Sequence, residues 1–180
     1  MPRHFALSGV GRDRPGIVAR VSAVLVRHGV NVEDSQMTIL RGHFTMVLIV
    51  TAPDEADADV LRDELAEAGR ELGLEALSLS PVEEIDSSVY PVPSHMVTVY
   101  GADHPGIMHA VSSAAAERGV DITDLTTRLI GEEAAPVYAL MMEVALPDGA
   151  DVGELEAALQ AVGREQGVDV SVRELESDAL

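Results

Sequence analysis

The sequence of 180 residues contains no cysteine, no tryptophan and no lysine, and only 3% of its residues are aromatic. Without cysteine the chain has no disulfide, no zinc–thiolate site and no thiol nucleophile. This lack agrees with a cytoplasmic location. With so few aromatic residues, aliphatic side chains must fill any core, and the 47% of hydrophobic residues are enough to do so.

Long hydrophobic runs and positive charge are also scarce. No segment is apolar for long enough to cross a bilayer, and the first residues lack the apolar core and cleavage site of a signal peptide. We therefore expect a soluble protein with no membrane partner. The 12 basic residues are all arginine and face 31 acidic ones, which gives a formal net charge of −19. Such a surface repels phosphate backbones, so we expect no direct binding of nucleic acid.

The sequence offers no set of residues for catalysis or metal binding. None of the six histidines has a partner at the i, i+4 spacing that places two imidazoles on one helix face. Ser22 and Ser112 fall within expected helices without a paired His–Asp arrangement. We predict no catalytic residue, no metal site and no cofactor.

One turn occurs twice, as Gly11-Arg12-Asp13-Arg14-Pro15-Gly16-Ile17 and as Gly101-Ala102-Asp103-His104-Pro105-Gly106-Ile107. Each copy follows β-type residues and opens an amphipathic helix. The aspartate can cap that helix, the proline suits its first turn, and the glycine lets another molecule approach the backbone. The main-chain amides and the positive end of the helix dipole then form a seat for a small carboxylate.

The repeated turn belongs to a duplication that covers nearly the whole chain. Adding 90 to residue numbers between 11 and 34 gives ten identities, and after a longer second hairpin an offset of 94 aligns the remainder. The acidic residues of that hairpin, Glu132 and Glu133, suit either a solvated loop or a basic partner. We predict two domains at 1–80 and 94–175, a semi-rigid proline-containing linker at 81–93, and an acidic tail at 176–180.

Periodicity in the first half indicates six elements in the order strand, helix, strand, strand, helix, strand. Their expected positions are strands at 5–10, 36–40, 44–51 and 74–80, and helices at 16–28 and from 54–59 to 72. This order predicts an α+β fold, with an antiparallel four-stranded sheet and both helices on one face. The strand at 44–51 is apolar on both faces, so it is expected in the sheet centre or in an interface.

The motif Gly-x-Asp-x-Pro-Gly-Ile, followed by a helix that ends in glycine and by Asn31-Val32, resembles the ACT domain. This is a small ferredoxin-like module that binds amino acids and regulates other activities. Two such modules resemble the glycine cleavage system transcriptional repressor family. The first half is also similar to the ACT segment of formyltetrahydrofolate deformylase, whose catalytic part has no counterpart in these residues.

The resemblance implies that a small amino acid, glycine or serine above all, binds where two modules meet. Carried over by position, the ligand-binding residues are Asp13, Arg14, Pro15, Gly16, Ile17 and Asn31, and Asp103, His104, Pro105, Gly106, Ile107 and Asp121. Asp121 stands where the family prefers asparagine. Because ionised aspartate only accepts hydrogen bonds, it repels a carboxylate beside it, and the first site is expected to be the better one.

Each of these residues also has a purely structural interpretation. The aspartates can serve as helix caps, the glycines can serve the turn alone, and Asn31 can be a local turn residue. Arg14 and His104 share one position, where a cation suits either a nearby anion or a solvated loop.

Three functions remain open at this point. The chain can be a regulator that binds an amino acid and modulates a transcription factor or enzyme through protein contact. It can belong to one-carbon metabolism as an enzyme or as an accessory module of the deformylase kind. It can also be an adaptor with no ligand. Edge strands invite pairing, so we expect either self-association as a homodimer or pairing of the two modules inside one chain, and the sequence does not choose between them.

Overall fold

The computed structural model describes residues 3–131 and 136–175. It divides into two compact units, Met1–Asp86 and Ser87–Leu180. The predicted acidic tail at 176–180 and the hairpin residues Glu132 and Glu133 lie outside the described residues. Each unit is considered by itself.

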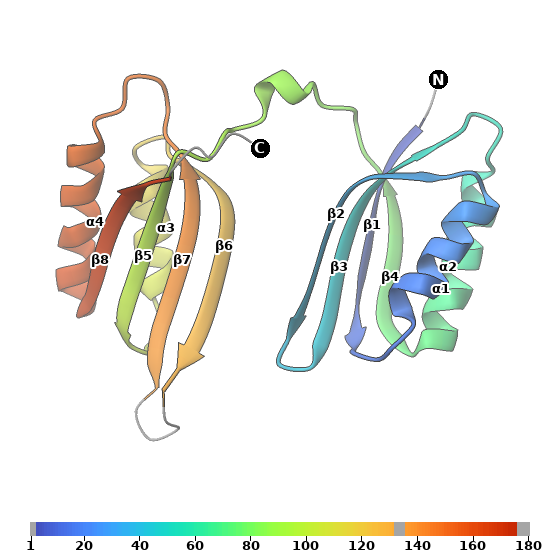
Figure 1. Ribbon diagram of the computed structural model, residues 1–180, viewed down its shortest axis with the longest axis horizontal. Coiled ribbons are helices and arrows are strands. Elements are labelled where there is room, and N and C mark those ends of the chain that lie inside the picture. The colour runs from blue at the N-terminus through green and yellow to red at the C-terminus, as the bar shows by residue number, and fades with distance from the viewer. Residues whose placement is uncertain (1–2, 132–135, 176–180) are drawn as a thin grey trace. The chain divides into compact units, whose positions relative to one another are not determined.

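The first unit contains a four-stranded sheet with two helices on one face, which Figure 1 shows on its blue and cyan part. The strand order is β2-β3-β1-β4, and every neighbouring pair is antiparallel. The predicted β-α-β-β-α-β fold is therefore confirmed. Its elements are β1 Arg3–Arg12, α1 Ile17–Arg27, β2 Asn31–Leu40, β3 His43–Ala52, α2 Ala58–Leu72 and β4 Leu74–Pro81.

The second unit repeats this arrangement with the order β6-β7-β5-β8, again antiparallel throughout (Figure 1). A short 3-10 turn, η1 Ser87–Val89, precedes it. Its elements are β5 His95–Ala102, α3 Ile107–Ala116, β6 Asp121–Ile130, β7 Val137–Ala145, α4 Val152–Gln166 and β8 Val168–Glu174.

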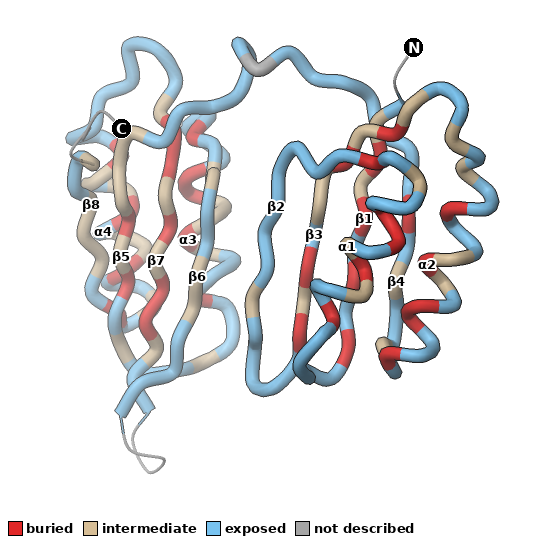
Figure 2. The backbone as a smooth tube through the Cα atoms, turned by 45° about the vertical axis from the view of Figure 1, so that its right-hand side comes forward, coloured by how far each residue is buried: buried red, intermediate tan, exposed pale blue. Residues whose placement is uncertain are grey.

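The core of each unit lies between the sheet and its helices and is almost wholly aliphatic. In β1 the buried residues alternate with exposed ones, and Phe5 and Leu7 face the helices. From α1, Val21 and Val24 enter the same core. Figure 2 shows this as buried segments on the inner strands and the facing sides of the helices, while β2 remains exposed. Close packing of aliphatic side chains thus compensates for the small number of aromatic ones.

The strands differ from the sequence prediction mainly at β2. This strand begins at Asn31 and not at Gln36. Its polar first residues pair with β3, and a β-bulge between Val32 and Asp34 shifts the register there. β2 lies at the sheet edge, where no buried apolar alternation is needed to specify a strand. The expectation for 44–51 is confirmed, since β3 lies between β2 and β1.

No helix within the described parts of the chain is long and apolar enough to cross a membrane.

A close backbone approach fixes the end of β1, just before the repeated turn. A Cβ atom on Gly11 would lie 2.8 Å from the Cα of Leu74 in β4, and one on Gly101 would lie 2.5 Å from Cγ1 of Val168 in β8. Real Cβ atoms do not tolerate such short contacts, and the Val168 Cα atom would also lie only 3.0 Å from a Cβ atom on Gly101. The two glycines therefore allow the last strand of each unit to pack beside the turn.

The substitution Gly11→Ala is expected to lower the free energy of unfolding by about 1–3 kcal/mol, because the backbone of β4 must move to admit a methyl group. Gly9→Ala is the matched control on the same strand. Its Cβ would meet only the flexible end of Leu77, at 3.1 Å, so a smaller loss is expected. Urea unfolding of the full chain measures both, and equal losses would contradict the close-approach explanation.

Candidate functional site

The repeated turn starts a helix with a glycine and without a side-chain cap. Gly16 is the N-cap residue of α1, with φ of 95°, and Gly106 is that of α3, with φ of 106°. These values lie in the left-handed region that favours glycine. Neither helix start has a side-chain capping hydrogen bond. The interpretation of Asp13 and Asp103 as helix caps is therefore wrong.

The prolines also lie outside the helices, because Pro15 and Pro105 precede the N-cap glycines. The expectation that these prolines occupy the first helical turn is wrong, because each lies one residue before the N-cap glycine. Aspartate caps do occur in the chain, at the other helix of each unit. Asp57 accepts hydrogen bonds from the amides of Asp59 and Val60, at 2.9 and 3.2 Å, and Asp151 caps α4 in the same way.

The uncapped helix starts leave main-chain amides available. The first hydrogen bond within α1 runs from the Arg20 amide to the Gly16 carbonyl, so the amides of residues 17–19 have no partner inside the helix. A Cβ atom on Gly16 would meet no atom within 4 Å, which means that the space beside this helix start is open. This geometry and the helix dipole favour a small anion.

The second turn has the same backbone but a less open surrounding. A Cβ atom on Gly106 would lie 3.7 Å from the side-chain oxygen of Gln166, the last residue of α4. The side chain of Gln166 thus takes up space beside the second turn that is empty beside the first. The two turns thus differ in their suitability for an anion.

Arg14 and His104 connect each turn to the end of the other helix of its unit. The Nη2 atom of Arg14 donates to the carbonyl of Glu71, at 2.6 Å, near the end of α2. The Nε2 atom of His104 lies 2.7 Å from the carbonyl of Gln166, at the end of α4. A cation is favoured there by the negative end of the helix dipole. Both side chains thus have a partner within their unit, while that of Arg14 is also exposed to solvent.

The pKa of His104 is raised above its ordinary value of 6.5. The main cause is the hydrogen bond to the Gln166 carbonyl, followed by that to the Pro105 carbonyl, at 3.1 Å from Nδ1. Both ring nitrogens can donate at once only in the protonated imidazole. The nearby charge of Asp103 adds to the upward shift, whereas desolvation opposes it.

Ile17 and Ile107 are buried, at 2% and 1% exposure, within the cores of their units. They anchor the first residue of α1 and of α3. Their side chains therefore position the turn, and only their main-chain amides lie at the helix start.

The β2–β3 hairpin lies beside the first turn and brings further positive charge to it. The Asp13 amide donates to the carbonyl of Gly42 at 3.0 Å, and Arg12 pairs with His43 across the sheet. Arg41, adjacent to Gly42, is exposed at the same end. The sequence did not point to Arg41 or His43, because only the strand register places this hairpin beside a turn some 30 residues earlier.

Asn31 and Asp121 do not lie at the turn of their own unit. Asn31 pairs with Thr51, whereas Arg12 pairs with His43 at the other end of β3. Eight residues of strand separate the two ends, which corresponds to roughly 26 Å. Asp121 pairs with Ala145 and Ala102 with Val137, so the second unit has the same separation. Within one unit the predicted site residues form two separate groups.

The described residues contain no group of three or more histidines and carboxylates that could hold a metal ion. Each unit is thus a small β-α-β-β-α-β module whose first helix starts without a side-chain cap. The sequence profile of the ACT domain matches residues 4–77 and 95–173, and the chain belongs to the ACT-domain family.

Known proteins share this double module. The chain is 33% identical over 168 residues to phosphoserine phosphatase SerB2 of Mycobacterium tuberculosis, an alignment that covers 91% of this chain and 39% of that enzyme. The chain thus spans well under half the length of this relative.

Crystal structures of other proteins match nearly the whole chain. An unknown protein from Galdieria sulphuraria has a TM-score of 0.77 and 28% identity, over 97% of this chain and 99% of that one. A candidate glycine cleavage system transcriptional repressor has a TM-score of 0.69 and 20% identity, over 97% and 98% of the two chains. The predicted resemblance to a tandem ACT protein of this kind is confirmed at the level of the fold.

Because Asp13 caps no helix, Asp13→Ala is expected to change the free energy of unfolding by less than about 0.5 kcal/mol. The matched control is Asp57→Ala, which removes an observed cap and is expected to cost about 1 kcal/mol. Urea unfolding distinguishes the two variants. A larger loss for Asp13→Ala than for Asp57→Ala would restore the capping interpretation.

The raised pKa of His104 makes the second unit more stable at low pH. The contribution of His104 is fully present below pH 6.5 and is lost as the pH rises through the raised pKa of the folded state. His104→Gln is expected to remove this dependence, whereas His109→Gln on the exposed side of α3 leaves it in place. An NMR titration of the His104 ring and urea unfolding below and above this range measure the effect. A His104 pKa at or below 6.5 would contradict it.

Proposed function

We propose that this chain is a non-catalytic regulatory protein that senses a small amino acid. The ligand binds where ACT modules meet and changes how the protein associates with a transcription factor or a metabolic enzyme. Glycine and serine are the preferred candidates, on the resemblance to glycine cleavage repressors alone.

The open, uncapped helix start at Gly16 carries this proposal. It presents main-chain amides and a positive helix end to empty space, and Arg12, Arg41 and His43 lie at the same end of the sheet. Together these groups favour the carboxylate of an amino acid. Arginine is neither a nucleophile nor a general base, and His43 has no nucleophilic side chain among these groups to activate, which supports binding without turnover.

The separation of Asn31 from the turn supports a site built by two modules. An amino acid has its carboxylate and ammonium groups on one carbon atom, so it cannot reach across the roughly 26 Å of one sheet. A site that uses both Asn31 and a turn must take them from different modules, in one chain or in two. This requirement agrees with the expectation that the ligand lies where modules meet, whether these modules belong to one chain or to two.

The proposed contacts to ligand are Asp13, Arg14, Pro15 and Gly16 in the first turn and Asp103, His104, Pro105 and Gly106 in the second, with Asn31 and Asp121 at the module edges. Ile17 and Ile107 contribute through their main chains. The first turn is the better carboxylate site, because Gln166 lies close to the second and Asp121 lacks a donor. The proposed division remains two domains at 1–80 and 94–175, a linker at 81–93 and a tail at 176–180.

A regulatory role toward an enzyme is a second candidate, and the match to SerB2 favours it. In that phosphatase a segment similar to nearly all of this chain is part of a longer enzyme. The two candidates share the ligand site and differ in the partner. A protein partner suits the net charge of −19 better than nucleic acid does in either case.

Calorimetry of the full chain with glycine, serine, and branched and aromatic amino acids tests the proposal. One class is expected to bind at millimolar concentration or better. Asn31→Ala is expected to weaken that binding by about tenfold, the effect of losing a hydrogen bond to a charged group. The matched control is Gln36→Ala, which removes an exposed amide from the same strand.

No binding of any amino acid at millimolar concentration would end the sensing proposal. Binding that survives unchanged in Asn31→Ala would instead reject the role of the module edge.

A further inference from the structure

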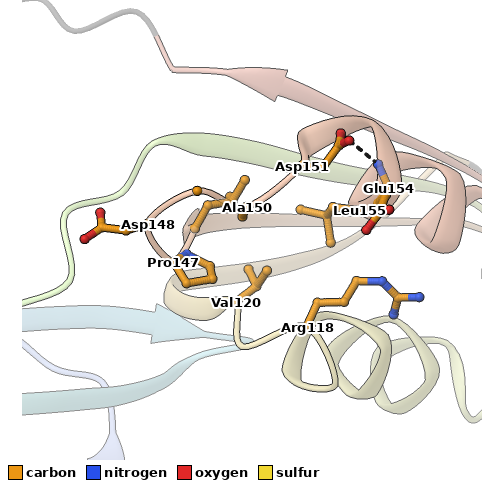
Figure 3. A pocket seen from close by; sticks show the side chains of 10 residues that line it. Arg118, Val120, Pro147, Asp148, Ala150, Asp151, Glu154 and Leu155 are labelled. Carbon is orange, nitrogen blue, oxygen red and sulfur yellow. Dashed lines mark hydrogen bonds between the residues drawn. The ribbon is translucent and has the colours of Figure 1, made fainter.

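The second unit contains a pocket that is separate from the repeated turn. Its volume is about 310 Å³, and it lies between the end of α3, the loop from β7 to α4, and the first turn of α4 (Figure 3). None of its lining residues belongs to the turn at 101–107. This volume is at the lower end of the range for small-molecule sites.

The pocket has an apolar floor and a charged rim. Val120 and Leu155 are buried and Leu146 is half-buried, and they supply aliphatic surface. Figure 3 shows Arg118 and Glu154 on one side of the pocket and Asp148 on the other. Charges of both signs therefore stand beside a surface that suits methylene groups.

Arg118 is held in place but has no close carboxylate partner on the facing helix. Its Nη1 atom donates to the carbonyl of Ala114 at 2.8 Å, and the carboxylate of neighbouring Glu117 lies 4.0 Å away. Five donors on a guanidinium leave others available for a ligand. A carboxylate can accept two of them in parallel.

The first unit treats the cation equivalent to Arg118 differently. With the offset of 90 residues this cation is His28, whereas the position of Arg27 is taken by Glu117. In the first unit Arg27 and His28 both pair with Glu64 of α2, at 2.6 and 3.3 Å. With the offset of 94 residues, the position of Glu64 is taken by Ala158 in α4. The contact between His28 and Glu64 therefore has no counterpart at Arg118, which lies beside the pocket.

We propose that this pocket binds a basic amino acid such as lysine or arginine. The α-carboxylate pairs with Arg118 and the α-ammonium group with Glu154, which lie on the same side. The methylene chain covers Val120 and Leu146, and the cationic end lies toward Asp148. Asp151 is already engaged as the cap of α4, through the amides of Gly153 and Glu154.

The charge balance favours a ligand of net positive charge. Arg118 is opposed by Asp148, Asp151 and Glu154, so the rim is negative overall. A neutral amino acid satisfies Arg118 and Glu154 but leaves Asp148 without a cation. A ligand with one carboxylate and two cationic groups matches all three.

An NMR titration of the full, isotope-labelled chain with L-lysine and L-arginine tests this site. The amide signals of Gly119, Val120, Gly149 and Ala150 are expected to shift, and norleucine, which lacks the cationic end, is expected to bind more weakly. Arg118→Gln, and Glu154→Val, which installs the residue of the first unit, are expected to weaken binding by about tenfold or more. The controls are Arg128→Gln and Glu156→Gln, which change charges of the same unit outside the pocket.

Absence of shifts at these four amides with millimolar lysine or arginine would overturn the proposal. Unchanged affinity in Arg118→Gln would do the same. Norleucine that binds as tightly as lysine would reject the role of Asp148. Because the amides of residues 16–19 report on the repeated turn, failure here and failure of the proposed sensing site are observed separately.

Discussion

A left-handed glycine at the start of the first helix of each unit is the constraint on which the candidate site depends. Gly16 and Gly106 turn the chain from strand to helix without offering a side-chain cap. An ordinary cap would satisfy the first amides internally, as Asp57 does in α2. The glycine start leaves these first amides available. The helix therefore lacks a stabilising cap at the place where the proposed ligand site needs free donors.

The tertiary structure holds that open start rigidly from several sides. Ile17 anchors the helix in the core, Arg14 bonds the end of α2, and the amide of Asp13 bonds the hairpin at Gly42. Gly11 lets β4 pack beside the same point. A preorganised turn of this kind lowers the entropic cost that ordering a loop adds to ligand binding.

The duplication has allowed the two units to diverge while the fold stayed the same. The first unit has the more open turn and a closed ion pair at Glu64. The second has Gln166 beside its turn and Arg118 beside a pocket. In these proposals one chain carries two kinds of amino-acid site at opposite ends of its modules. The two sites differ in ligand because they differ in charge at a few positions.

The sequence by itself determined the duplication, the order of elements and the antiparallel sheet, because these follow from local periodicity and from glycine and proline positions. It also located both repeated turns. It misjudged the role of Asp13 and the start of β2, since a cap and an edge strand depend on hydrogen bonds that local pattern does not specify. Only the tertiary structure decided that Arg14 reaches α2, that Arg41 lies beside the turn and that Asn31 does not, because strand register sets which distant residues share one end of a sheet.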